Sequence, residues 1–83
     1  PGAYAVLDGH IIKIWKSTIG EKLSSDTLNG SIVKFDKNGI YVKCGDGIII
    51  LNVIQPEGKK KMEAYNYING LKNKEELKGK VLV

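Results

Sequence analysis

Apolar and polar side chains alternate along several short stretches of the chain, a pattern typical of strands that bury one face. The alternation is clearest in Ile40–Cys44, where Ile40, Val42 and Cys44 are expected to point inward and Tyr41 and Lys43 outward. The predicted strands are Ala3–Val6, His10–Ile19, Ser31–Phe35, Ile40–Cys44 and Ile48–Ile54, with Val81–Val83 as a candidate closing strand. Ile48–Ile54 is the most apolar of them, so we expect it to be central.

Turn-forming residues separate these stretches. Asp8-Gly9 is the dipeptide of a tight type I′ hairpin turn, and Asp36–Gly39 ends in the turn pair Asn-Gly. Gly45–Gly47 reverses the chain once more. The segment Gly20–Gly30 is polar and irregular, and it is therefore predicted to be a loop.

The periodicity changes near the C-terminus. Gln55–Gly58 breaks the strand pattern with a proline and a glycine. After this break the apolar residues follow the spacing i, i+3, i+4 and i+7, namely Ala64, Tyr67, Ile68 and Leu71. This spacing predicts one helix from about Lys60 to Asn69, with Gly70 as its C-cap and a single turn over Asn73–Lys78.

These elements predict an all-β fold with one helix, in a single domain over residues 1–83. Five or six strands this short cannot cover a core as one flat sheet, so we expect them to curl into a small OB-fold-like β-barrel. An SH3-like barrel is the competing arrangement, because strand order cannot be read from the sequence.

The charge of the chain favours a polyanionic partner. The net charge is +4, from 13 lysines, no arginine and 9 acidic residues. A lysine ammonium group is a point charge, and it lacks the planar guanidinium of arginine, which forms bidentate hydrogen bonds with bases and phosphates. Lysines therefore suit contacts that do not depend on nucleic-acid sequence. The alternative is that the charge only keeps a small domain soluble.

Other functional classes find little support in the composition. The single cysteine, Cys44, excludes an internal disulfide framework and indicates a reducing, cytoplasmic location. With one cysteine and one histidine, His10, a structural zinc site is not expected. Apolar runs such as Ile48–Leu51 are far short of the roughly 20 residues that span a bilayer.

The candidate contact residues are lysines and aromatic side chains. Lys59–Lys61 places three cations ahead of the predicted helix, where the helix dipole disfavours positive charge. Because the run is unfavourable for the helix, we interpret it as a functional contact. The alternative is a run of solvated surface charges. The remaining candidates are Lys13, Lys34, Lys43 and Tyr41, which are predicted on strand faces where cations meet phosphates and rings stack on bases. For Trp15 we prefer burial, beneath the helix or against another domain, over base stacking. Cys44 is expected in the core and His10 on the surface.

Three blocks of residues resemble the C-terminal domain of the methionyl-tRNA formyltransferases. The first block is Pro1-Gly2-Ala3-Tyr4 followed by Lys13-Ile14-Trp15-Lys16, and the second is Gly39-Ile40, Val42 and Cys44–Gly47. The third and most specific runs from Leu51 to Met62, through Gln55-Pro56-Glu57-Gly58-Lys59-Lys60-Lys61-Met62, and continues in Ala64, Tyr67, Ile68 and Gly70.

The resemblance implies an OB-fold-like accessory domain that follows an N-terminal catalytic domain of Rossmann type. That catalytic domain would hold the cofactor 10-formyltetrahydrofolate and the catalytic residues, so none is expected here, and Pro1 is expected to mark a domain boundary. The implied partners are initiator Met-tRNA and the catalytic domain in the same chain, with no membrane and a monomeric state. The alternative is a structural or assembly domain of a related formyltransferase that acts on a sugar nucleotide or on folate.

Overall fold

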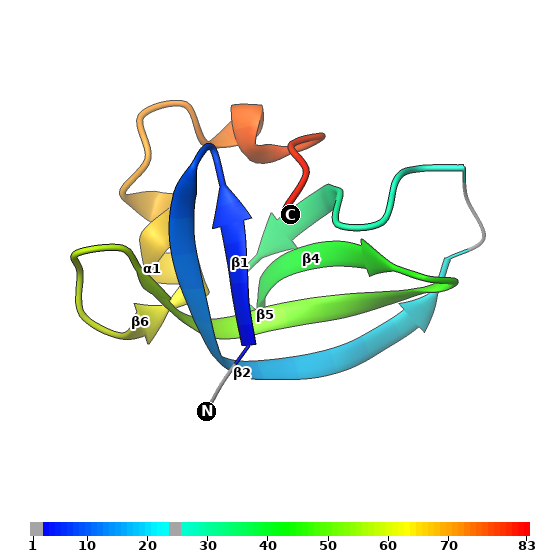
Figure 1. Ribbon diagram of the computed structural model, residues 1–83, viewed down its shortest axis with the longest axis horizontal. Coiled ribbons are helices and arrows are strands. Elements are labelled where there is room, and N and C mark those ends of the chain that lie inside the picture. The colour runs from blue at the N-terminus through cyan, green and yellow to red at the C-terminus, as the bar shows by residue number, and fades with distance from the viewer. Residues whose placement is uncertain (1–2, 24–25) are drawn as a thin grey trace.

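The computed structural model describes residues 3–23 and 26–83, and within them the chain forms an antiparallel sheet with one short α-helix. In chain order the elements are β1 (Ala3–Leu7), β2 (His10–Lys22), β3 (Ile32–Asp36), β4 (Gly39–Cys44), β5 (Gly47–Pro56), β6 (Met62–Glu63), α1 (Ala64–Asn69) and a 3-10 turn (Lys74–Leu77) (Figure 1). The predicted fold class, all-β with a single helix, is confirmed.

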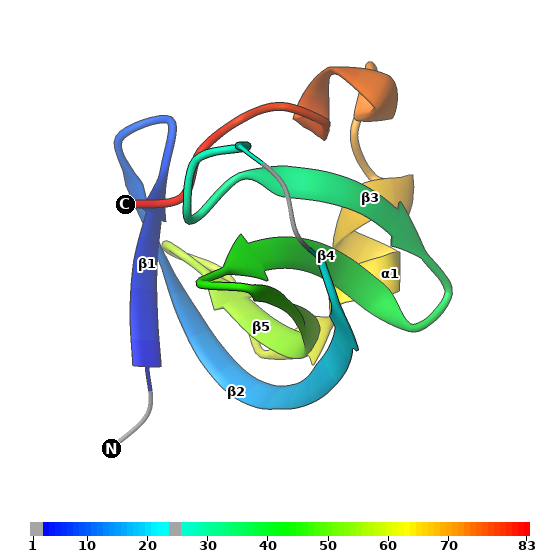
Figure 2. The same cartoon turned by 90° about the vertical axis from the view of Figure 1, so that its right-hand side faces the viewer.

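The strand order is β1-β2-β5-β4-β3, with β6 added to β5. The apolar strand β5 is therefore central, as its composition predicts. β2 is longer than predicted, since it continues past Ile19 to Lys22 and takes the first residues of the expected loop. Three register shifts bend β2 along its pairing with β5, so that it sweeps from β1 around β5 (Figure 2).

The two outer strands of this path, β1 and β3, are joined by the end of the chain and not by a strand ladder. Val6 and Val83 exchange two backbone hydrogen bonds of 3.1 Å, and the Leu82 amide donates to the Gly30 carbonyl at 2.8 Å. Only one isolated bridge, Ser31 with Val81, is found in the described part of this segment. The sheet is thus not closed into a barrel, because the predicted closing strand Val81–Val83 is too short to pair regularly with either neighbour.

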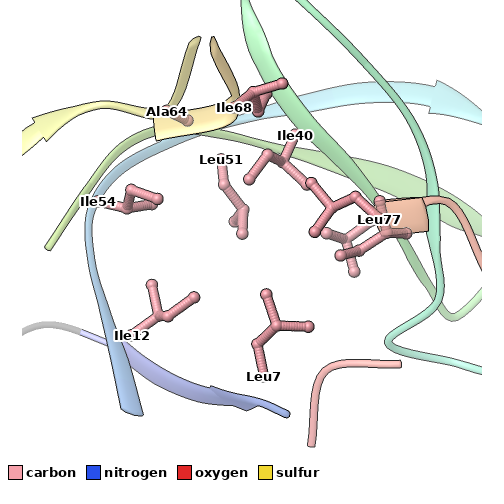
Figure 3. Packing of buried hydrophobic residues seen from close by; sticks show 10 residues of the cluster. Leu7, Ile12, Ile40, Leu51, Ile54, Ala64, Ile68 and Leu77 are labelled. Atoms are coloured by element: carbon pink, nitrogen blue, oxygen red, sulfur yellow. The ribbon is translucent and has the colours of Figure 1, made fainter. Parts of the chain in front are cut away.

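The core lies between the curved sheet and the helical segments (Figure 3). Its buried members are Leu7, Ile12, Ile32, Ile40, Val42, Leu51, Ile54, Ala64, Ile68 and Leu77. Ala64 and Ile68 are one turn apart on α1, so the helix covers the core with one face. At about 25 cal/mol per Å² of apolar surface removed from water, burial of these side chains is the main stabilising contribution.

The helix begins later than predicted. Met62 and Glu63 pair with Ile54 and Val53 of β5, which holds this stretch in an extended conformation until Ala64. Lys59–Lys61 therefore lies in the β5–β6 connection and not in the first turn of the helix. The end of the helix agrees with prediction, because the Gly70 amide donates to the carbonyls of Asn66 and Tyr67 at 3.2 Å.

The inward and outward positions predicted for the end of β4 are wrong. Lys43 is buried, with 6% of its surface exposed, whereas Cys44 is exposed. The cause is a non-local neighbour: the Gly30 amide donates to the Lys43 carbonyl, and the Lys43 amide donates to the Ser31 carbonyl. The segment around Asn29 thus covers Lys43, whose Nζ donates to Asn29 Oδ1 at 3.1 Å and to the Gly45 carbonyl at 2.7 Å.

Candidate nucleic-acid interface

Trp15 lies at an irregularity of β2 and points to the surface. Ile14 pairs with Ile54 and Lys16 pairs with Val53, so Trp15 is an extra residue with no partner opposite it on β5. Nearly half of the residue, 48%, is exposed. Its indole N–H donates to Gln55 Oε1 at 3.0 Å. Trp15 is therefore not buried beneath the helix, whereas its burial against another domain stays a prediction.

Two predicted contact lysines meet at this ring. Lys13 Nζ lies 4.2 Å from the centre of the Trp15 ring, and Lys61 Nζ lies 4.7 Å from it. Lys13 Nζ is also 5.8 Å from the ring of Tyr4, its neighbour across the β1–β2 pair. Each distance is within the range of a cation–π interaction. Residues from β1, β2 and the β5–β6 connection therefore form one cationic and aromatic surface.

The connection that carries Lys59–Lys61 is fixed at its base by hydrogen bonds. Gln55 Nε2 donates to the Lys59 carbonyl at 3.0 Å, and the Lys59 amide donates to the Pro56 carbonyl at 3.0 Å. All three lysines of the run are exposed. We call the residues Lys13, Trp15, Gln55, Lys59 and Lys61 the Trp15 cluster.

Glu57 ties the same connection to β2. Its carboxylate accepts the Ile11 backbone N–H at 3.0 Å and faces His10 Nδ1 at 3.4 Å. The Ile11 N–H first, and His10 next, lower the pKa of Glu57 below its ordinary value of 4.5. Glu57 therefore contacts β2 and does not lie at the start of the helix. His10 is exposed, as predicted, but it has an acidic partner.

Lys34 and Tyr41 form a separate pair on β3 and β4. Lys34 Nζ lies 4.4 Å from the centre of the Tyr41 ring, and the Tyr41 hydroxyl donates to Asp36 Oδ2 at 2.8 Å. The pair lines a groove together with Ile48 and Ile50 of β5. Among the described residues, no hydrogen bond or ion pair joins this pair to the Trp15 cluster.

The structure therefore sorts the predicted contact residues into three groups. Lys13 and Lys61 meet at Trp15 with Lys59 and Lys60 beside them, Lys34 and Tyr41 stand apart, and Lys43 is covered by the chain. Gln55 is a member of the cluster that was not predicted. The signal that would have found it is the pairing of Lys13 with Gln55 on neighbouring strands, which requires the strand order.

No group of three or more His, Cys, Asp or Glu residues suited to a metal ion occurs within residues 3–23 and 26–83. Of the helices formed by these residues, none has the length and apolar character needed to cross a membrane.

Comparison with known proteins decides the family. The model of the formyl transferase C-terminal domain family matches residues 1–72. The chain belongs to this family. The resemblance stated from the sequence blocks is confirmed, and the matched residues of the formyl transferase C-terminal domain include every member of the Trp15 cluster.

Several curated relatives of this formyl transferase C-terminal domain share one name. A methionyl-tRNA formyltransferase of Dictyoglomus thermophilum is 42% identical over 72 residues, and one of Finegoldia magna is 43% identical over 70 residues. One of Lachnospira eligens is 31% identical over 74 residues. Each match covers 84% of this chain and 22–24% of the relative, so the chain spans about a quarter of the length of these relatives.

Proposed function

We propose that the chain is an RNA-binding accessory domain that holds a methionyl-tRNA by its sugar–phosphate backbone while another part of a longer protein formylates it. The observation that carries the proposal is the Trp15 cluster, where Lys13 and Lys61 meet although they lie far apart in the sequence. The relatives named methionyl-tRNA formyltransferase supply the substrate class. They also favour it over a sugar nucleotide or folate as substrate.

The chemistry of the cluster suits backbone contact and not base reading. All 13 basic side chains of the protein are lysines, whose ammonium groups attract phosphates without discriminating between bases. Such contacts contribute to the reaction by proximity and orientation of the aminoacyl end. We therefore expect similar affinity for initiator and elongator tRNA, falling with salt.

The rest of the proposed reaction lies outside this chain. We infer that the longer protein is a transferase, that its formyl donor 10-formyltetrahydrofolate binds in a separate catalytic domain, and that this domain contacts the present one. We also propose an OB-fold-like arrangement of the sheet, a cytoplasmic location and a monomeric state. By itself the 83-residue chain is expected to give no formyl transfer from 10-formyltetrahydrofolate to methionyl-tRNA.

The test is a titration of tRNA at several salt concentrations with a variant in which Lys59, Lys60 and Lys61 are all replaced by Ala. We expect weaker binding, and a slope of log affinity against log salt that is flatter by about 0.7–0.9 per lost phosphate contact. The matched control replaces Lys37, Lys72 and Lys74 by Ala, which removes the same charge from exposed positions outside the cluster.

Two further variants sharpen this test. Lys43→Met should leave the slope unchanged, because the Nζ of Lys43 is hydrogen-bonded inside the protein and is not free to meet phosphate. Lys34→Ala asks whether the separate Lys34–Tyr41 pair takes part. Thermal melts should show that wild type, the Lys59–Lys61 variant and the matched control are all folded. Equal slopes for the three proteins would then mean that the lysine run is solvated and does not contact RNA.

A further inference from the structure

Trp15 contacts Lys13 of β2, Gln55 of β5 and Lys61 of the β5–β6 connection. Its ring is in contact with Lys13 and Lys61, and its indole N–H reaches Gln55, whose amide in turn holds the Lys59 carbonyl. The two hydrogen bonds form a chain, Trp15 to Gln55 to Lys59, that links the surface of β2 to the β5–β6 connection. Both cationic segments are therefore attached to a single side chain.

We propose that Trp15 is a positioning residue, which holds Lys13 and the Lys59–Lys61 connection together so that their ammonium groups meet one stretch of RNA backbone. The inference rests on the proposed function and deepens it. It assigns to Trp15 an indirect role: the indole organises the cations, and the cations contact the phosphates.

The physical basis is the freedom that a lysine loses on binding. A lysine has a flexible four-carbon stem, and fixing several such stems at once opposes binding by their lost rotamer freedom. The Trp15 ring fixes two of them before RNA arrives, since a ring face attracts each ammonium. Drawing two like charges to one ring also makes them repel, and a phosphate between them relieves this repulsion.

The ring itself is poorly placed to stack on a base. Two ammonium groups already lie over it at 4.2 and 4.7 Å, and its N–H is used by Gln55. A base would have to displace at least one cation before reaching the ring face. Direct stacking of Trp15 is therefore the rival explanation that the experiment must separate from positioning.

The separating experiment is a double-mutant cycle on tRNA affinity. Trp15→Leu is measured in the wild-type chain and in a chain that carries Lys13→Ala and Lys61→Ala. If Trp15 acts through these lysines, we expect roughly a fivefold loss of affinity in the wild-type chain and a change within about twofold in the lysine variant. Equal losses in the two backgrounds, as direct stacking requires, would overturn the inference and leave the proposed function standing.

Two milder variants protect this test against misfolding. Trp15→Phe keeps a ring face but removes the N–H, and Gln55→Met keeps the length of the side chain but removes both of its hydrogen bonds. Each should weaken binding less than Trp15→Leu, and their effects should not add, because they break the same chain of bonds. Additive effects contradict the proposed link. Tyr65→Leu, at an exposed aromatic residue of α1, is the matched control and should bind as wild type.

A second readout is tryptophan fluorescence, which reports on Trp15 alone because it is the single tryptophan of the chain. Inorganic polyphosphate carries phosphates and no bases, so it probes the lysines without stacking. We expect it to change Trp15 fluorescence in the wild-type chain and to have little effect when Lys13 and Lys61 are Ala. An unchanged wild-type spectrum with polyphosphate, in a chain that binds tRNA, overturns the positioning role. If the wild-type chain binds no tRNA, the proposed function fails and the inference falls with it.

Discussion

Gly39 shows how a single residue fixes the packing of neighbouring strands. It starts β4 at a φ of 137°, a backbone conformation that residues with a side chain rarely adopt. A Cβ at this position would overlap the backbone carbonyl oxygen of Leu51 on β5. Leu51 pairs with the adjacent residue, Ile40, and both are buried, so moving the strands apart would disturb this pairing and the core.

Gly39→Ala is therefore expected to destabilise the fold by about 2–4 kcal/mol, because backbone strain and a steric clash act together. Gly45→Ala is the matched control, since Gly45 also has a positive φ, 63°, but an added Cβ would meet nothing within 4 Å. The control should lose only about 1–2 kcal/mol. Urea unfolding of both variants measures the difference in the free energy of unfolding. Equal losses of stability would mean that small backbone shifts relieve the clash at Gly39.

At the scale of elements, the connection between β5 and β6 is attached to β2 by one carboxylate. Glu57 accepts the backbone N–H of Ile11, and His10 approaches its second oxygen. This attachment and the Trp15–Gln55 bond hold the same connection from two sides. The position of the exposed lysine run thus depends on β2 as much as on its own strand.

The lowered pKa of Glu57 gives this attachment a pH dependence. Because the folded state lowers this pKa, the stabilisation is fully present above the ordinary value of 4.5 and is lost as the pH falls through the lower, folded-state value. Thermal melts between pH 7 and pH 3 should therefore decline less steeply for Glu57→Gln than for the wild type. Glu21→Gln, at an exposed carboxylate of β2 with no hydrogen-bond donor in the described structure, should decline as the wild type does. Parallel curves for all three proteins would contradict the attachment.

At the scale of the whole molecule, the features that could be predicted from the sequence are those determined by neighbouring residues. Alternation predicts the strands, and apolar composition predicts the central place of β5. Asp8-Gly9 predicts the first hairpin, where both residues have positive φ. The burial of Lys43 depends on Asn29, and the start of the helix depends on the pairing of Met62 with Ile54. Both contacts depend on which segments pair, which the alternation within one segment does not specify.

The candidate site follows the same division. The lysine run is visible in the sequence as a feature that a helix start would disfavour, although the structure places it before β6. The meeting of Lys13 and Lys61 at Trp15 is not visible, because it requires β2 and β5 to be neighbours. Strand order is set by the packing of the whole core, which periodicity within one strand does not specify.

The β2–β5 ladder also determines how fast the chain can find its fold. The ladder joins Lys22 with Gly47 and Ile12 with Pro56, so a long loop must close before it forms. The chain therefore loses conformational entropy before the contacts of the ladder stabilise the fold. Ile54→Val, at a fully buried residue of this ladder, should slow refolding in stopped-flow measurements, whereas Leu77→Ala in the C-terminal turn should mainly speed unfolding. The opposite pattern would place the transition state in the local segments. Refolding limited by this closure keeps the apolar face of β5 open to solvent for most of the folding time.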